Sequence, residues 1–139
     1  MSAAYLAPYT PPAPALPITL GLPGERPTFG PYEGLVDSGA DISIVPRSLL
    51  VQMGIPSVAT ATIRGQWSER RIVRLYLVDV ELAETRLPDV YVAGDEEGDE
   101  IILGRNLLNK LALFLDGPAQ QAEALDDAAV NRLRARRAE

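Results

Sequence analysis

The sequence predicts an all-β sandwich or barrel with one or two short helices and a helical C-terminal tail. Short apolar runs recur along the chain, segments rich in Pro and Gly separate them, and stretches with helical periodicity are few. The chain has 139 residues, of which 47% are hydrophobic, so it is long enough for one packed domain and too short for two full ones.

The first predicted strands follow an N-terminal segment of biased composition. Residues 1–16 are rich in Ala and Pro, which predicts a flexible, extended arm. Apolar runs then come at residues 17–22 and 32–37, and the segment between them carries the Pro and Gly signals of turns. We therefore expect a β-hairpin at the start of an ordered domain that spans residues 17–116.

A strand and a short helix are predicted next. The stretch DISIV, residues 41–45, alternates with a period of two, which predicts a strand with Ile42 and Ile44 on one face. The stretch PRSLLVQMG, residues 46–54, predicts a short helix, because Pro suits the first helical turn and Gly commonly follows the last one.

The rest of the predicted domain is again mostly β-structure. Its apolar runs alternate with short polar links, and a single acidic loop interrupts them. The predicted elements are a second hairpin over residues 62–74 with its tip at 65–68, strands at 75–82, 87–93, 100–104 and 112–117, an acidic loop at 94–100, and one or two helical turns at 105–111.

Residues 117–139 predict a charged helix or tail. Acidic residues come first and arginines come last, an order that suits the dipole of an α-helix. Leu125, Ala129 and Leu133 form only a thin apolar stripe. The tail is therefore either a solvated, partly docked helix or a segment that binds an anion or a partner.

The composition excludes several kinds of chemistry. The chain has no cysteine and no histidine, which rules out disulfides, thiol catalysis, imidazole bases and the usual zinc sites, so no metal and no cofactor is expected. The net charge of −6 argues against a nucleic-acid partner, and no apolar run is long enough to span a membrane. The N-terminus lacks the pattern of a signal peptide, so a cytoplasmic location is expected.

One motif places a carboxylate among apolar residues. In GLVDSGADISIVP, residues 34–46, apolar residues lead into Asp37, and an apolar run resumes after Asp41. Asp-Ser-Gly alone is a common turn. Here we expect core strands to grip the turn, and a carboxylate is costly to bury unless it is paired or hydrogen-bonded. A catalytic acid is the alternative to a plain turn.

A second motif, IILGRNLL at residues 101–108, carries three large aliphatic residues into Gly104. A glycine after a buried apolar run commonly marks the close approach of another backbone. Taken alone, the motif is a strand that leads into a helix with a glycine at the junction.

Together, and in this order, the two motifs resemble those of the retropepsin-like aspartic proteases. In that family an apolar pair precedes Asp-Ser/Thr-Gly-Ala, as in LVDSGA at residues 35–40, and an Ile-Leu-Gly-Arg element follows further on, as in IILGRN at residues 101–106. The resemblance spans residues 17–116 and is nearest to the single-lobe, dimeric proteases of cellular and bacterial type. It implies a retropepsin-like acid-protease barrel.

The resemblance implies that Asp37 is the catalytic acid and base. Aspartic proteolysis needs two carboxylates that share one proton across a water molecule, and the chain contains one Asp-Ser-Gly turn. The implied enzyme is therefore a homodimer with Asp37 of each subunit at the two-fold axis, acting on a peptide or protein substrate. Ser38 would orient the carboxylate and brace the neighbouring subunit, and Gly39 would offer its carbonyl to the substrate.

The resemblance also implies supporting roles. Ala40 and Asp41 would line the cleft, with Asp41 held in an ion pair by Arg105, and Gly104 would pack behind the active turn. The stretch LALFL, residues 111–115, would supply a strand to the dimer interface.

Gly65, Gln66 and Trp67 are the predicted flap, which would cover the substrate cleft. Many members have a glycine-rich flap tip, whereas TIRGQWSER has one glycine. Trp67 is a lid over the substrate, an interface residue or a core aromatic, and the sequence leaves these open.

Two other functions remain beside proteolysis. The same fold could serve as a catalytically silent module for dimerisation or peptide binding. The arm and the charged tail would also suit a structural domain of a larger assembly.

Overall fold

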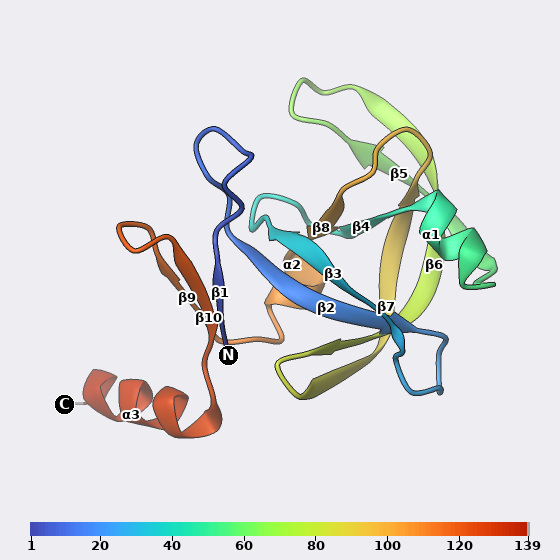
Figure 1. Cartoon of the computed structure of the whole chain (residues 1–139). Coiled ribbons are helices and arrows are strands. Elements are labelled where there is room, and N and C mark those ends of the chain that lie inside the picture. The colour runs from blue at the N-terminus through green and yellow to red at the C-terminus, as the bar shows by residue number, and fades with distance from the viewer. Residues whose placement is uncertain (139) are drawn as a thin grey trace.

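The computed structural model describes residues 1–138 and confirms the predicted all-β fold (Figure 1). Its larger sheet consists of β2 (Ala15–Gly21), β3 (Phe29–Val36), β4 (Ser43–Pro46), β5 (Ser57–Arg64), β6 (Arg70–Leu82), β7 (Thr85–Asp95) and β8 (Ile101–Leu103). Six of these strands follow one another in the order β2-β3-β8-β4-β7-β6, and the pairing of β2 with β6 closes them into a barrel. β5 pairs with β6 and extends the sheet as a hairpin.

The barrel is held together by the alternation of its strands. In β2 the side chains of Leu16, Ile18 and Leu20 are buried, and in β6 those of Val78 and Val80 meet them in the same core. Burial of each such aliphatic side chain contributes about 1.5–3 kcal/mol. The period-two pattern therefore fixes which face of each strand points inward.

Turn residues set the connections that the sequence predicts. The hairpin of β2 and β3 is confirmed, and β6 and β7 are joined by Ala83 and Glu84, both at positive φ, as a type I′ hairpin turn requires. The predicted helix is α1 (Arg47–Gln52), which is followed by Gly54 at a φ of 74°. The helical turn after β8 is α2 (Arg105–Leu108).

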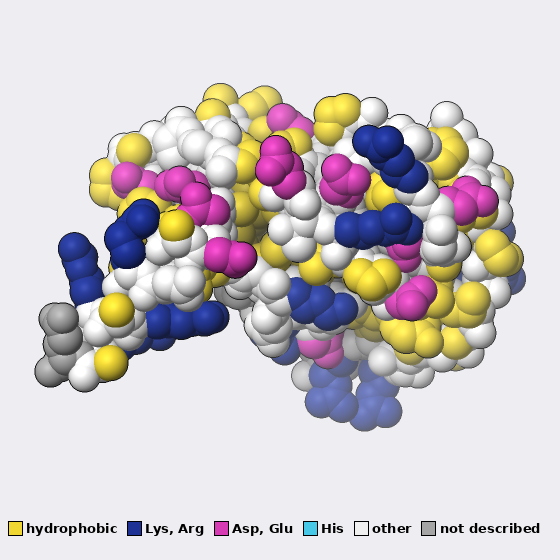
Figure 2. Space-filling model, turned by 90° about the horizontal axis from the view of Figure 1, so that it is seen from below, with side chains coloured by type: hydrophobic (Ala, Val, Ile, Leu, Met, Phe, Trp, Pro, Cys, Tyr) yellow, Lys and Arg dark blue, Asp and Glu magenta, His cyan; other side chains and the backbone are white. Residues whose placement is uncertain are grey.

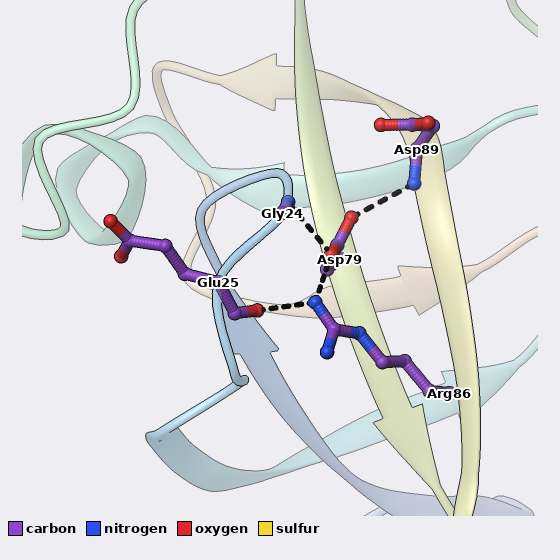
Figure 3. A network of polar contacts seen from close by, with 5 residues as sticks. All are labelled: Gly24, Glu25, Asp79, Arg86 and Asp89. Atoms are coloured by element: carbon purple, nitrogen blue, oxygen red, sulfur yellow. Dashed lines mark hydrogen bonds and ion pairs between the residues drawn. The ribbon is translucent and has the colours of Figure 1, made fainter.

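A buried acid ties together the end of the barrel where β2, β6 and β7 meet (Figure 3). Asp79, 1% exposed, accepts hydrogen bonds from the backbone N–H of Gly24 and of Asp89 and from the Arg86 guanidinium at 2.7 Å. Arg86 also donates to the carbonyl of Glu25. Burial alone raises the pKa of the Asp79 carboxyl, but these hydrogen bonds and the Arg86 charge outweigh it and hold the pKa below its ordinary value.

The prediction of a flexible arm over residues 1–16 is wrong at both ends of the segment. β1 (Ser2–Ala4) pairs with β10 (Gln121–Ala124), which pairs in turn with β9 (Leu113–Asp116), and β2 begins at Ala15. A strand at the N-terminus and two strands that precede the C-terminal helix thus form a second, three-stranded sheet beside the barrel (Figure 1). Backbone pairing with β10 outweighs the weak propensity of an Ala-rich segment.

The middle of the arm is also held against the barrel. Leu6 and Ala13 form an isolated bridge, and Tyr9 donates a hydrogen bond to the Glu100 carboxylate. This hydrogen bond, with burial and the charges of Glu100 and Asp99, raises the pKa of the Tyr9 phenol.

The charged C-terminal segment is helical only in its second half. Its helix is α3 (Asp127–Arg137), whose first turn is capped by the Asp126 carboxylate accepting from the Ala129 N–H. α3 buries no side chain and projects from the body, with basic side chains at its end (Figure 2). Gln121–Ala124, also predicted as helical tail, forms a strand instead. Within residues 1–138 no helix is both long enough and apolar enough to cross a membrane.

Candidate active site

The predicted catalytic turn joins two strands that lie on either side of β8. β3 pairs with β8 in parallel, and β4 approaches the other edge of β8 through the antiparallel pairing of Ile44 with Ile102. Asp37 directly follows β3, and its backbone N–H donates to the Leu103 carbonyl at 3.1 Å. The two sequence motifs, more than sixty positions apart in the chain, are therefore brought together at one end of the barrel.

The turn holds the Asp37 carboxylate open to solvent. Its Oδ1 accepts from the Gly39 N–H at 3.0 Å, and the Ala40 N–H donates to the Asp37 carbonyl at 3.2 Å. Asp37, Ser38 and Gly39 are all exposed in the single chain. The expectation that core strands grip the turn therefore holds for its ends and not for its exposed middle. The strands anchor its ends, while its carboxylate points away from the core.

The predicted ion pair between Asp41 and Arg105 is not formed in this chain. Arg105 instead donates from Nη1 to the Ser38 carbonyl at 2.8 Å and from its backbone N–H to the Ala40 carbonyl at 2.8 Å. Among residues 1–138, Asp41 has no ion-pair partner. Arg105 thus holds the turn through backbone carbonyls, which carry enough partial charge to satisfy a guanidinium.

Gly104 packs directly behind the turn, as predicted. A Cβ atom at this position would lie 2.5 Å from the Ile42 carbonyl oxygen, 2.6 Å from the Ile42 carbonyl carbon and 3.0 Å from the Ala40 oxygen. These neighbours are backbone atoms, which cannot turn aside as a side chain does. Only glycine therefore lets the two motifs approach this closely.

A buried polar pair that the sequence did not predict holds the two motifs together. Ser43 is 1% exposed, and the Asn106 Oδ1 accepts from both its N–H and its Oγ–H at 2.9 Å. The Ser43 Oγ accepts from the Gly104 N–H at 3.0 Å, and the Asn106 Nδ2 donates to the Tyr91 carbonyl at 2.8 Å. The sequence gives no signal for this pair, because the alternation of DISIV places Ser43 on the face opposite to Ile42 and Ile44, whereas the structure buries Ser43 and leaves those two residues partly exposed.

The predicted flap is the hairpin of β5 and β6. Its tip is a turn in which the Ser68 N–H donates to the Gly65 carbonyl, and the Glu69 carboxylate folds back to accept from the Trp67 N–H. Trp67 is 85% exposed, which excludes the core-aromatic interpretation and leaves the lid and the interface.

A cavity of about 760 Å³ lies between this hairpin and the residues that directly follow the Asp-Ser-Gly turn. It is lined by Asp41, Ile42 and Asn106 from the motifs, by Tyr91 from β7, and by residues of the hairpin, which are Ala61, Thr62, Ile63, Arg64, Arg70 and Leu75. Asp41 is part of this lining, whereas Ala40, also predicted to line the cleft, and Gly65, Gln66 and Trp67 at the tip lie outside it. No group of three or more acidic side chains within residues 1–138 is arranged to hold a metal ion.

Three solved structures to which this chain is similar are proteases or protease-like domains. One is the protease of simian foamy virus (16% identity, TM-score 0.46, 68% of this chain and 91% of that one). Another is a retropepsin-like aspartic protease from Rickettsia conorii (16% identity, TM-score 0.47, covering 67% of this chain and 76% of that one). A third is the retroviral protease-like domain of Ddi1 from Leishmania major (18% identity, TM-score 0.49, covering 83% of this chain and 95% of that one).

The family comparison covers the part of the chain that carries both motifs. No curated protein matches the chain. A family model described as "gag-polyprotein putative aspartyl protease" matches residues 30–110, which is more than half of the chain and includes the Asp-Ser-Gly turn, the tip of the β5–β6 hairpin and the Gly-Arg element. The chain therefore belongs to the retropepsin-like aspartyl protease family.

Proposed function

We propose that the protein is a homodimeric aspartic endopeptidase in which Asp37 of each subunit supplies one of the two catalytic carboxylates. The observation that carries this proposal is the placement of Asp37. Its carboxylate is exposed on a turn whose ends are fixed by β3, β8 and Arg105, and the same turn continues into the wall of the cleft at Asp41. A fixed carboxylate beside a peptide-sized cleft suits general acid–base catalysis.

The need for two carboxylates supports the dimer. The chain has one Asp-Ser-Gly turn, so a second copy must supply the other acid. β9 offers a surface for that copy: within residues 1–138 it pairs only with β10, and its Phe114 and Leu115 are 51% and 46% exposed. An unpaired edge with large apolar side chains favours pairing with another strand.

The mechanism follows from two carboxylates held a few ångströms apart. Like charges at this distance cannot both ionise easily, so the pair retains one proton. The ionised carboxylate accepts a proton from water as the water attacks the peptide carbonyl, and the protonated one polarises that carbonyl. In this mechanism Ser38 would brace the partner subunit, and Gly39 would meet the substrate backbone. The substrate would lie extended in the cleft.

The test is cleavage of a mixed peptide library between about pH 4 and pH 7 by the wild type and by Asp37→Asn, with the oligomeric state measured by ultracentrifugation. The proposal predicts cuts by the wild-type dimer that disappear in the variant. A confirmed dimer that cuts nothing would refute the protease and favour a silent peptide-binding module.

A further inference from the structure

The flap hairpin carries an arrangement of charge that proteolysis by itself does not require. Arg64 at the end of β5 lies directly opposite Arg70 at the start of β6 in the hairpin register. Like charges directly opposite each other across two strands destabilise a hairpin. Both side chains are exposed and both line the cleft.

Neither arginine is neutralised by a neighbour in the chain. Among residues 1–138 the ion pairs are those of Arg71 with Glu97 and of Arg86 with Asp79, and neither includes Arg64 or Arg70. Glu69, the acid next to them on the hairpin, is turned toward the tip, where its carboxylate accepts from the Trp67 N–H.

The cleft as a whole is therefore cationic on its flap side. Its lining contains two arginines against one acid, Asp41, and Asp41 is on the opposite wall, in the catalytic turn. The rest of the lining is mostly apolar, with Ile42, Ile63 and Tyr91 among its members. Low-dielectric walls of this kind focus the field of a charge and strengthen its attraction for an opposite one.

We propose that the cleft selects peptides with a glutamate or aspartate side chain that docks between Arg64 and Arg70. This inference rests on the proposed function, because it assigns the substrate class of the same cleft. A guanidinium matches a carboxylate in geometry and binds it through two parallel hydrogen bonds. A bound carboxylate would also remove the repulsion between the two arginines, so substrate binding and flap closure would favour each other.

The experiment compares peptides that differ only in charge. A library with an apolar pair at its centre carries one Glu, or the neutral Gln in its place, at each flanking position in turn. Cleavage is measured with the wild type, and binding of the same labelled peptides is measured by fluorescence anisotropy with Asp37→Asn. Both are repeated in Arg64→Gln, Arg70→Gln and the double variant. The matched control is Arg74→Gln, an exposed arginine of β6 outside the cleft lining.

The expected result is a preference for Glu over Gln of about tenfold at one flanking position. The double variant abolishes the preference, each single variant reduces it, and Arg74→Gln retains it. Because the double variant relieves a cross-strand repulsion, its melting temperature should equal or exceed that of the wild type.

Equal cleavage and binding of Glu and Gln peptides, or a preference that survives in the double variant, would overturn the inference. If the wild type cuts nothing, the proposed protease fails, and the binding data alone decide the inference. Tighter binding of Glu peptides that depends on the two arginines then sustains it, and equal or absent binding refutes it.

Discussion

The side chain of Asn106 holds Ser43 by two hydrogen bonds, with its Oδ1 accepting from both the N–H and the Oγ–H of Ser43 at 2.9 Å. This pair connects β4, the strand after the Asp-Ser-Gly turn, to α2, the helix that begins at Arg105. The geometry of the turn therefore depends on a contact between two residues that lie outside it.

Ser43→Ala should destabilise the protein and misplace the catalytic turn. The substitution leaves the buried Gly104 N–H without its acceptor, which costs about 2 kcal/mol of unfolding free energy. Chemical denaturation measures this loss. Ser48→Ala, at an exposed position of α1, is the control and should change the free energy of unfolding by less than about 0.5 kcal/mol. Equal effects of the two substitutions would contradict the role of the pair.

Gly104→Ala should be more damaging than its size suggests. The added methyl group would meet the Ile42 backbone at 2.5 Å, so we expect a loss of about 3 kcal/mol and loss of peptide cleavage. Gly117→Ala is the matched control, because nothing lies within 4 Å of a Cβ at that position. Thermal unfolding of both variants checks the prediction, and a Gly104→Ala protein as stable as the control would show that the two motifs are not packed this tightly.

Trp67→Ala should leave stability unchanged and impair activity. The side chain is 85% exposed, so the free energy of unfolding should change by less than about 0.5 kcal/mol. If the indole closes over the substrate, KM rises severalfold at an unchanged dimer affinity. A weaker dimer with an unchanged KM would instead place Trp67 in the subunit interface. A marked loss of stability would contradict its exposure.

Asp79 should make stability depend on pH in the acid range. The pKa of the Asp79 carboxyl is lowered in the folded protein, so the carboxyl binds a proton more readily in the unfolded chain. Its contribution to the free energy of unfolding is therefore complete above the ordinary pKa of 3.8. That contribution is lost as the pH falls through the lower, folded-state pKa. Asp79→Asn should therefore cost about 2 kcal/mol near neutral pH and progressively less below about pH 4.

Urea unfolding between about pH 2 and pH 7 measures how the difference in unfolding free energy between Asp79→Asn and the wild type shrinks as the pH falls. Glu84→Gln, in the exposed turn between β6 and β7, is the control and should parallel the wild type at every pH. A constant difference between Asp79→Asn and the wild type down to the lowest pH would argue against a lowered pKa.

Local signals in the sequence predict most of the barrel. Turn residues and apolar alternation predict the two hairpins and α1, because these elements depend on neighbours only a few positions away in the sequence. β1 and β10 are different, because Ser2–Ala4 and Gln121–Ala124 are short and Ala-rich and favour no strand by themselves. β10 pairs with β9 on one side and with β1 on the other, and β1 forms a strand because β10 supplies its backbone partners from a distant part of the chain.

The residues of the candidate site also divide into those that local sequence signals predict and those that they do not. Asp37 and Gly104 are recognisable because their residue types are unusual next to apolar runs. The bond from Arg105 to the Ser38 carbonyl and the pair of Ser43 with Asn106 are not recognisable, because each depends on which of several polar groups lies within reach after folding. Asp41 and Arg105 belong to motifs that meet in the fold, yet they do not pair, because Arg105 donates to the Ser38 carbonyl instead.

Mixing the two kinds of subunit tests most directly whether each active site needs Asp37 from two chains. A fixed amount of wild type is equilibrated with increasing Asp37→Asn protein, and cleavage of a peptide that the wild type cuts is followed. If both carboxylates are required, a ninefold excess of the variant reduces the rate to about a tenth, because most wild-type subunits then have a variant partner. A rate that stays constant over the whole titration would contradict a shared active site.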